Sequence, residues 1–137
     1  MTAPKLEVYD WQGNGYKPLV ASNGWLVALL NWEPNADLEK ACEIEAHFES
    51  DEVFVLLCGR AALYLITEKG FEVIEVQPGR IYNVCRATWH GVINTRDASW
   101  LIVENRDVSE QNSAIRPLTE EEKRVLKANA PDWAKQV

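Results

Sequence analysis

The sequence lacks a long hydrophobic run and a basic cluster. Its longest apolar stretch, from Gly24 to Leu30, is seven residues, whereas a membrane-spanning helix needs about 20. The 14 Lys and Arg residues are scattered among 21 Asp and Glu residues, which gives a formal net charge of −7. A phosphate backbone is bound by clustered basic side chains. We therefore expect neither a membrane nor a nucleic acid as a partner.

Secretion signals and cysteine motifs are also lacking. The first seven residues contain no basic segment followed by an apolar one, so we expect a cytoplasmic protein. The three cysteines, Cys42, Cys58 and Cys85, cannot all pair within one chain, and their spacing matches no zinc or redox motif. We expect them to be reduced and buried in strands.

What the sequence does contain is typical of one folded domain. Its 137 residues are 47% hydrophobic and 26% charged, with no low-complexity tract and no internal repeat. This length suits a single compact unit. We expect one domain over residues 1–137.

Short apolar runs separated by turn residues extend from about residue 6 to residue 105. They are rich in β-branched and aromatic residues, which predicts an all-β sandwich or barrel. The expected strands are Leu6–Tyr9, Trp25–Asn31, Ala41–His47, Glu52–Leu57, Ala61–Thr67, Phe71–Val76, Ile81–Val84, Thr88–Ile93 and Trp100–Glu104.

The C-terminal part has a different character. Residues 107–116 are polar and aperiodic, and we expect a connecting loop there. Thr119 and Glu122 form a capping box, with acidic residues in the first turn and basic residues behind them. This pattern predicts one helix from Glu120 to Asn129, which ends before Pro131 and packs on the outside of the β unit.

The two histidines lie in contexts typical of ligands. In the run from Cys42 to His47, polar and apolar residues alternate, so that Glu43, Glu45 and His47 share one face of the expected strand. That face is polar and could bind a metal ion.

Two segments carry a resemblance to a known family. They read Glu45-x-His47-x4-Glu52-x6-Gly59 and Gly79-x10-His90-x3-Asn94. Both resemble the signature motifs of the cupins, in which a His-x-His pair, a glutamate and a later histidine are spaced in this way. The sequence departs from the motifs at four positions: Glu45 replaces the first histidine, Glu39 and Ala87 replace glycines, and Cys85 replaces a proline. Because of Ala87 we expect a different turn before His90.

The resemblance implies an all-β fold, the cupin double-stranded β-helix or jelly-roll barrel, over about residues 6–105. A C-terminal loop and one helix would follow over about residues 107–137. Cupins commonly form dimers through an exchanged N-terminal strand or through back-to-back sheets. We therefore expect a homodimer, with the strand at Leu6–Tyr9 as the exchanged segment.

By the same resemblance, Glu45, His47, Glu52 and His90 would hold one divalent metal ion. Two imidazoles with carboxylates suit Mn, Fe, Ni or Zn. Cupins include dioxygenases, isomerases and lyases, and the fold does not select among these reactions. If the protein is an enzyme, its substrate is a small polar or acidic organic molecule, and the general base is Glu45 or Glu43, whichever is not coordinated.

Two residues are candidates for the pocket wall, and a rival interpretation stays open. Phe54 and Leu56 follow Glu52 at intervals of two residues, so they share its face. In the rival interpretation the barrel holds no metal, and the protein is a non-catalytic sensor or carbohydrate-binding module. The polar face of Glu43, Glu45 and His47 would then only hydrogen-bond a small-molecule ligand.

Overall fold

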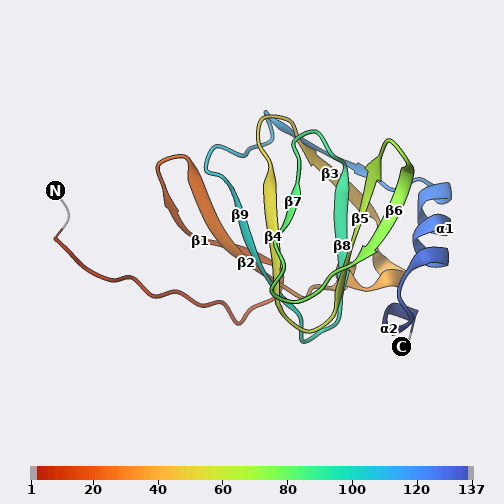
Figure 1. The fold of residues 1–137 in the computed structure, drawn as a ribbon, viewed down its shortest axis with the longest axis horizontal. Coiled ribbons are helices and arrows are strands. Elements are labelled where there is room, and N and C mark those ends of the chain that lie inside the picture. The colour runs from red at the N-terminus through yellow and green to blue at the C-terminus, as the bar shows by residue number, and fades with distance from the viewer. Residues whose placement is uncertain (1–2, 136–137) are drawn as a thin grey trace.

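Two five-stranded antiparallel sheets face each other in the computed structural model, which describes residues 3–135 (Figure 1). In spatial order, the first sheet contains β1 (Tyr16–Ser22), β2 (Trp25–Asn31), β9 (Ser99–Asn105), β4 (Glu52–Cys58) and β7 (Tyr82–Val84). The second contains β10 (Ser113–Pro117), β3 (Glu43–His47), β8 (His90–Asn94), β5 (Ala61–Thr67) and β6 (Gly70–Glu75). The expected all-β architecture is confirmed.

The main core lies between the sheets. Trp100, Leu56 and Ile102 are almost fully buried there, and alternation along β4 and β9 directs their side chains inward. Gly59, which follows β4, has a φ of 79°, and a Cβ added to it would lie 2.5 Å from the Cα of Ala98. Only glycine fits this turn without strain.

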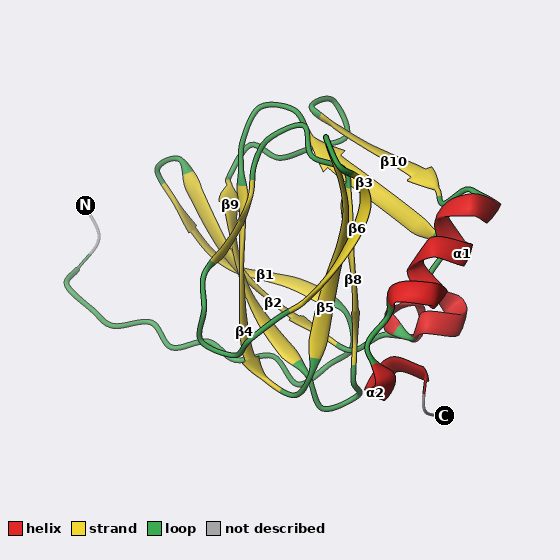
Figure 2. Cartoon of the chain, turned by 45° about the vertical axis from the view of Figure 1, so that its right-hand side comes forward, coloured by secondary structure: helices red, strands yellow, loops and turns green. Residues whose placement is uncertain are grey.

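A second apolar cluster covers the outer face of the second sheet. The expected helix is α1 (Glu120–Asn129), with the capping box formed by Thr119 and Glu122. Its Leu126 packs with Ile44 and Ile93 of the sheet, and a short helix, α2 (Asp132–Lys135), follows it. Both helices lie on the side of the second sheet (Figure 2). No helix within residues 3–135 is long and apolar enough to span a membrane.

Most strands form close to their expected bounds, but the first and last strands along the chain differ from the prediction. The expected strand at Leu6–Tyr9 is wrong, because this segment is an exposed, extended arm that pairs with no strand within residues 3–135. The first strand is β1, which forms a hairpin with β2 through Asn23 and Gly24, a favoured two-residue turn. Pro18 lies next to an irregularity in this edge strand, where proline is tolerated.

Two further corrections concern the loop and the cysteines. The expected loop over 107–116 contains the start of β10, which pairs with β3 along its whole length. Cys42, Cys58 and Cys85 are free as predicted, but all three are exposed rather than buried. They lie before β3, at the end of β4 and in a turn after β7, where alternation no longer directs side chains into the core.

Two short 3₁₀ helices, η1 (Pro34–Ala36) and η2 (Leu38–Lys40), connect the first sheet to the second. Ala36 and Leu38 are buried, so this connection is fixed against the β unit. The chain then enters β3, which carries Glu43, Glu45 and His47 on one face.

Candidate metal centre

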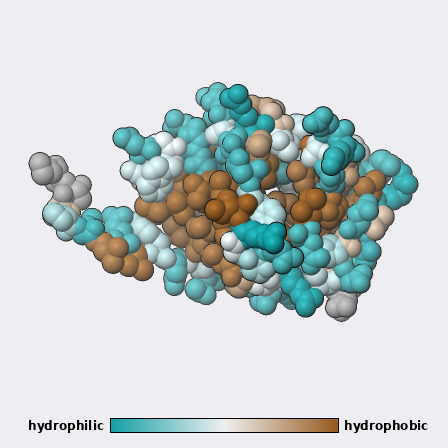
Figure 3. Space-filling model, in the orientation of Figure 1, coloured by the Kyte–Doolittle hydropathy of each residue, from teal (hydrophilic) through white to brown (hydrophobic). Residues whose placement is uncertain are grey.

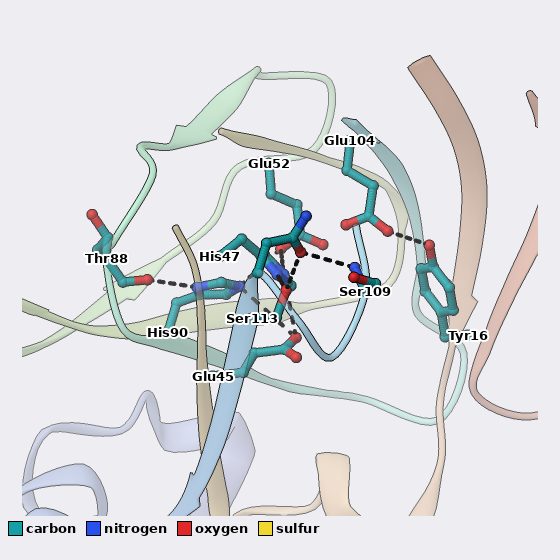
Figure 4. A network of polar contacts seen from close by, with 10 residues as sticks. Tyr16, Glu45, His47, Glu52, Thr88, His90, Glu104, Ser109 and Ser113 are labelled. Carbon is teal, nitrogen blue, oxygen red and sulfur yellow. Dashed lines mark hydrogen bonds and ion pairs between the residues drawn. The ribbon is translucent and has the colours of Figure 1, made fainter. Parts of the chain in front are cut away.

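The four residues singled out as metal ligands come together between the two sheets. Glu45 and His47 lie on β3, His90 on β8, and Glu52 on β4 of the opposite sheet. One potential ligand atom from each lies within 4.8 Å of the others. Figure 4 shows their side chains converging on a common point. The sequence thus identified four residues that the fold brings into one cluster.

Strand register explains this convergence. Glu45 on β3 is directly opposite His90 on β8, which places both side chains on the inner face of the second sheet. His47 follows two residues later on the same face of β3, as alternation requires. Glu52 reaches the cluster from the first sheet, where it faces Glu104 on β9.

The Glu52 carboxylate is the centre of the cluster. Its Oε1 atom lies 2.9 Å from Nε2 of His90 and 3.0 Å from Nε2 of His47. Glu45 lies farther out, with its Oε1 at 4.0 Å from each of these nitrogen atoms. Glu52, His47 and His90 are buried, whereas the side chain of Glu45 is 40% exposed.

The outer nitrogen of each imidazole is held by a hydrogen-bond acceptor. Nδ1 of His90 lies 2.9 Å from the carbonyl oxygen of Thr88, which can only accept, so this nitrogen carries a proton. Nδ1 of His47 lies 2.8 Å from Oγ of Ser113. That hydroxyl donates to Oδ1 of Asn112 at 3.2 Å, so it accepts from His47. Both inner Nε2 atoms are therefore free to present a lone pair.

This arrangement fits a metal ion. The lone pair on each inner nitrogen and the negative charge of the carboxylate repel each other at this distance. A cation between them, either a proton or a metal ion, removes this repulsion. Nε2 of His47 is buried and has no aligned hydrogen-bond partner among the described residues, despite its short distance to Glu52. Anchored imidazoles with a free inner nitrogen are typical of metal-binding histidines.

Electrostatics couple the three buried groups. The short contact of His47 with Glu52 and the negative charge of that carboxylate raise the pKa of His47. Burial opposes protonation of His90, but the contacts with Glu52 and Thr88 outweigh it, so the pKa of His90 is also raised. Burial of Glu52 works against its ionisation, yet the two imidazoles lower its pKa to about 2. Without a metal ion, protonation of one imidazole would balance the carboxylate.

A cavity of about 420 Å³ adjoins the cluster. Phe54 lines it, as predicted, and so does Glu43 at its exposed edge. Leu56 does not line the cavity, so its assignment to the pocket wall is wrong. It lies two residues beyond Phe54 on β4, which places its side chain in the core around Trp100. Tyr64 donates a hydrogen bond to the carbonyl of Glu43 at 2.7 Å and so ties β5 to β3.

Two polar residues beside the cluster were missed in the sequence. Tyr16 on β1 donates a hydrogen bond to Glu104 on β9 at 2.5 Å (Figure 4). Burial, together with the negative charge of Glu52, raises the pKa of Glu104 to about 7. Glu104 could have been found as a polar residue on the inward face of a predicted apolar strand. Tyr16 could not, because β1 was not predicted.

The turn before His90 contains Ala87, which has a φ of 65°. It is the one non-glycine residue with positive φ among residues 3–135. Its N–H donates to the carbonyl of His47 at 2.6 Å. The turn therefore adopts a conformation suited to glycine even though alanine occupies it, and His90 is aimed at the cluster.

Similarity to known proteins is found in the structure rather than in the sequence. No protein-family model and no curated protein matches the sequence. Among solved structures, a cupin-2 domain protein from Shewanella frigidimarina has a TM-score of 0.55 at 18% identity, over 70% of this chain and 85% of that chain. Pac13, described as a nucleoside dehydratase and known from Streptomyces, has a TM-score of 0.58 at 11% identity, over 81% of this chain and 86% of that chain. KdgF from Halomonas has a TM-score of 0.54 at 14% identity, over 75% of this chain and 91% of that chain. The chain therefore has the cupin fold, with its jelly-roll barrel and C-terminal helix.

Proposed function

We propose that this protein binds one divalent metal ion through Glu45, His47, Glu52 and His90, and that it acts on a small polar organic molecule in the adjoining cavity. The observation that carries the proposal is the fixed orientation of the two imidazoles. Thr88 and Ser113 hold the outer nitrogen of each ring, so both inner lone pairs point at the Glu52 carboxylate.

Nitrogen and oxygen ligands in this proportion suit Mn, Fe, Ni or Zn. A bound ion of this kind would polarise a carbonyl or activate a water molecule or oxygen. Glu43, at the cavity edge, is the candidate for a general base when Glu45 is coordinated. If Glu45, whose Oε1 lies 4.0 Å from each imidazole Nε2, is not coordinated, it takes that role instead. A dioxygenase, an isomerase and a lyase are all compatible with this set.

Metal titration tests the proposal. We expect metal-free protein to bind one Mn²⁺ ion per chain, measured by electron paramagnetic resonance, and His90→Ala to bind it at least about 100-fold more weakly because a buried ligand is lost. Glu68→Gln, an exposed change in the turn after β5, is the matched control and should bind like the parent. Circular dichroism would verify that each variant is folded.

Failure of the parent to bind Mn, Fe, Ni or Zn at neutral pH would favour a second function, metal-free ligand binding. One observation supports that alternative: Glu52 already contacts both imidazoles directly, at 2.9 and 3.0 Å. A protonated imidazole would then satisfy the carboxylate, and the cavity would serve only for recognition of a small molecule.

We also propose that two copies of the chain form a homodimer. The outward residues of the first sheet are apolar and half-buried, although no helix within residues 3–135 covers them, and Figure 3 shows this face as a hydrophobic surface. They are Val27, Leu29, Val53, Val55, Leu101 and Val103. The nearby arm exposes 86% of Leu6 and 81% of Val8. A second copy would cover both the sheet face and the arm.

A further inference from the structure

The wall of the cavity carries charge of one sign. Five glutamates line it, and the lining residues include no lysine and no arginine. The five are Glu33, Glu43, Glu45, Glu52 and Glu104. They come from both sheets and from the segment after β2, so the fold gathers them around one space.

No basic side chain that the structure describes neutralises these carboxylates. Among the described residues, none of the five forms an ion pair with a lysine or an arginine. Within residues 3–135, the only charged partners within 4.0 Å are His47 and His90, which contact Glu45 and Glu52. Glu33 and Glu43 have no such partner in this part of the chain.

A bound metal ion would not reverse the sign of the cavity. The two positive charges of a divalent ion equal the two negative charges of Glu45 and Glu52. Glu33 and Glu43 would still face the space without counter-charge, and Glu104 would add to them when ionised. An anionic ligand would therefore meet uncompensated carboxylates in a partly enclosed site, where charges are screened less than at the surface.

A second observation indicates that this space is a ligand site rather than a chance acidic cluster. The side chain of His47 is 8% exposed, and its Nε2 atom points into this space without an aligned hydrogen-bond partner among the described residues, although Glu52 lies 3.0 Å away. Phe54, Ile102 and Val92 provide apolar wall beside the polar groups. Apolar walls with a few convergent polar groups are typical of small-molecule sites.

We propose that the ligand of this cavity carries a positively charged group, such as a primary amine, and that the cavity discriminates against small carboxylates and phosphates. This inference rests on the proposed function, because it names the class of molecule held at that same site. An ammonium group can donate three hydrogen bonds, and the carboxylates of Glu33 and Glu43 accept without donating. Tyr16 and Phe54 also line the wall, and aromatic side chains can attract a cation.

Three sugars with a common ring test the charge preference: glucosamine, glucose and glucuronate, which carry a cationic, a neutral and an anionic substituent. We expect the Mn²⁺-loaded protein to bind glucosamine at least about tenfold more tightly than glucuronate, measured by calorimetry at low salt, with glucose between them. Equal binding, preference for glucuronate, or no binding of glucosamine at about 10 mM would overturn the inference.

Variants locate the source of the preference. Glu33→Gln combined with Glu43→Gln should reduce the ratio of the two affinities several-fold, because it removes two carboxylates without changing side-chain shape. The matched control, Glu68→Gln, lies outside the cavity and should leave the ratio unchanged. Equal effects of the cavity and control variants would indicate the overall negative charge of the chain instead, and would overturn the inference.

Metal binding is measured separately, so the two proposals fail in different ways. If Mn²⁺ binds but glucuronate is preferred, the metal site stands and the charge inference is wrong. If no metal binds and the metal-free protein still prefers glucosamine, the proposed metal site is wrong, while the charge of the cavity still governs recognition.

Discussion

Replacing Glu52 by glutamine should destabilise the metal-free protein in a strongly pH-dependent way. The carboxylate is 5% exposed and lies within 3.0 Å of both imidazoles. Its pKa falls from 4.5 to about 2 in the folded protein. Each pH unit of such a change corresponds to about 1.4 kcal/mol, so the ionised group contributes about 3 kcal/mol when the imidazoles are protonated.

The sign of the effect changes with pH. Because its folded pKa is lowered, Glu52 contributes stability above pH 4.5, and this is lost as the pH falls toward 2. The pKa values of His47 and His90 are raised, so their contribution is present below 6.5 and is lost as the pH rises through the folded values. Glu52→Gln should therefore cost most between about pH 4.5 and 6.5.

At higher pH the same substitution should cost little or even stabilise. With both imidazoles neutral, the wild-type carboxylate is a buried charge without a cation, which is unfavourable. A glutamine of the same shape removes that charge. We expect a loss of about 3 kcal/mol at pH 6 and less than about 1 kcal/mol, or a gain, at pH 10.

Urea unfolding in the presence of EDTA, followed by tryptophan fluorescence, measures the free energy of unfolding at each pH. The chain has six tryptophans, and its two histidines allow direct titration by NMR. Glu43→Gln, on the exposed edge of β3, is the control and should change stability by less than about 0.5 kcal/mol. An equal loss at pH 6 and pH 10, or unchanged histidine pKa values in Glu52→Gln, would refute the reasoning.

Three further outcomes are expected. Ser113→Ala frees the outer nitrogen of His47 and should weaken Mn²⁺ binding by about 10-fold or more in the titration described above, and unchanged affinity would show that the ring is held otherwise. In thermal unfolding, Gly59→Ala should destabilise the protein by more than about 2 kcal/mol, because it creates strain at a positive φ, whereas Ala87→Gly should stabilise it by about 1 kcal/mol, because it relieves such strain. Effects of the same sign would contradict this. Light scattering should give twice the chain mass of 15.6 kDa for the parent and a lower mass for Leu6→Asp, whereas a parent mass of 15.6 kDa would contradict the dimer.

The sequence predicts the interior strands well because their alternation is a direct consequence of having one buried face. Trp25–Asn31 and Ala61–Thr67 coincide with β2 and β5. The edge strands β1 and β10 carry a weaker signal, since one side of each has no partner strand and each contains a proline. Their existence depends on the neighbours with which they pair, and these lie far away or across a turn.

The candidate site divides in the same way. His47, Glu52 and His90 are implied by the resemblance to the cupin motifs, and the spacing of those motifs fits the strands on which they lie. The groups that orient them are not implied in this way: Ser113 reaches His47 from 66 residues away along the chain, through the pairing of β10 with β3. Thr88 acts through its carbonyl oxygen, which any residue type would provide. Local sequence therefore identifies the candidate ligands, whereas topology supplies their orientation.

The distribution of the site over both sheets joins stability to binding. Glu52 belongs to the first sheet, while Glu45, His47 and His90 belong to the second, so whatever cation lies between them connects the two halves of the barrel. In the metal-free protein a protonated imidazole would supply that cation, and a bound metal ion would have to displace the proton. Metal binding would then release protons and weaken as the pH falls, and an ion bound only by the folded chain would add stability by mass action. Folding of the barrel and binding at the site would thus be linked.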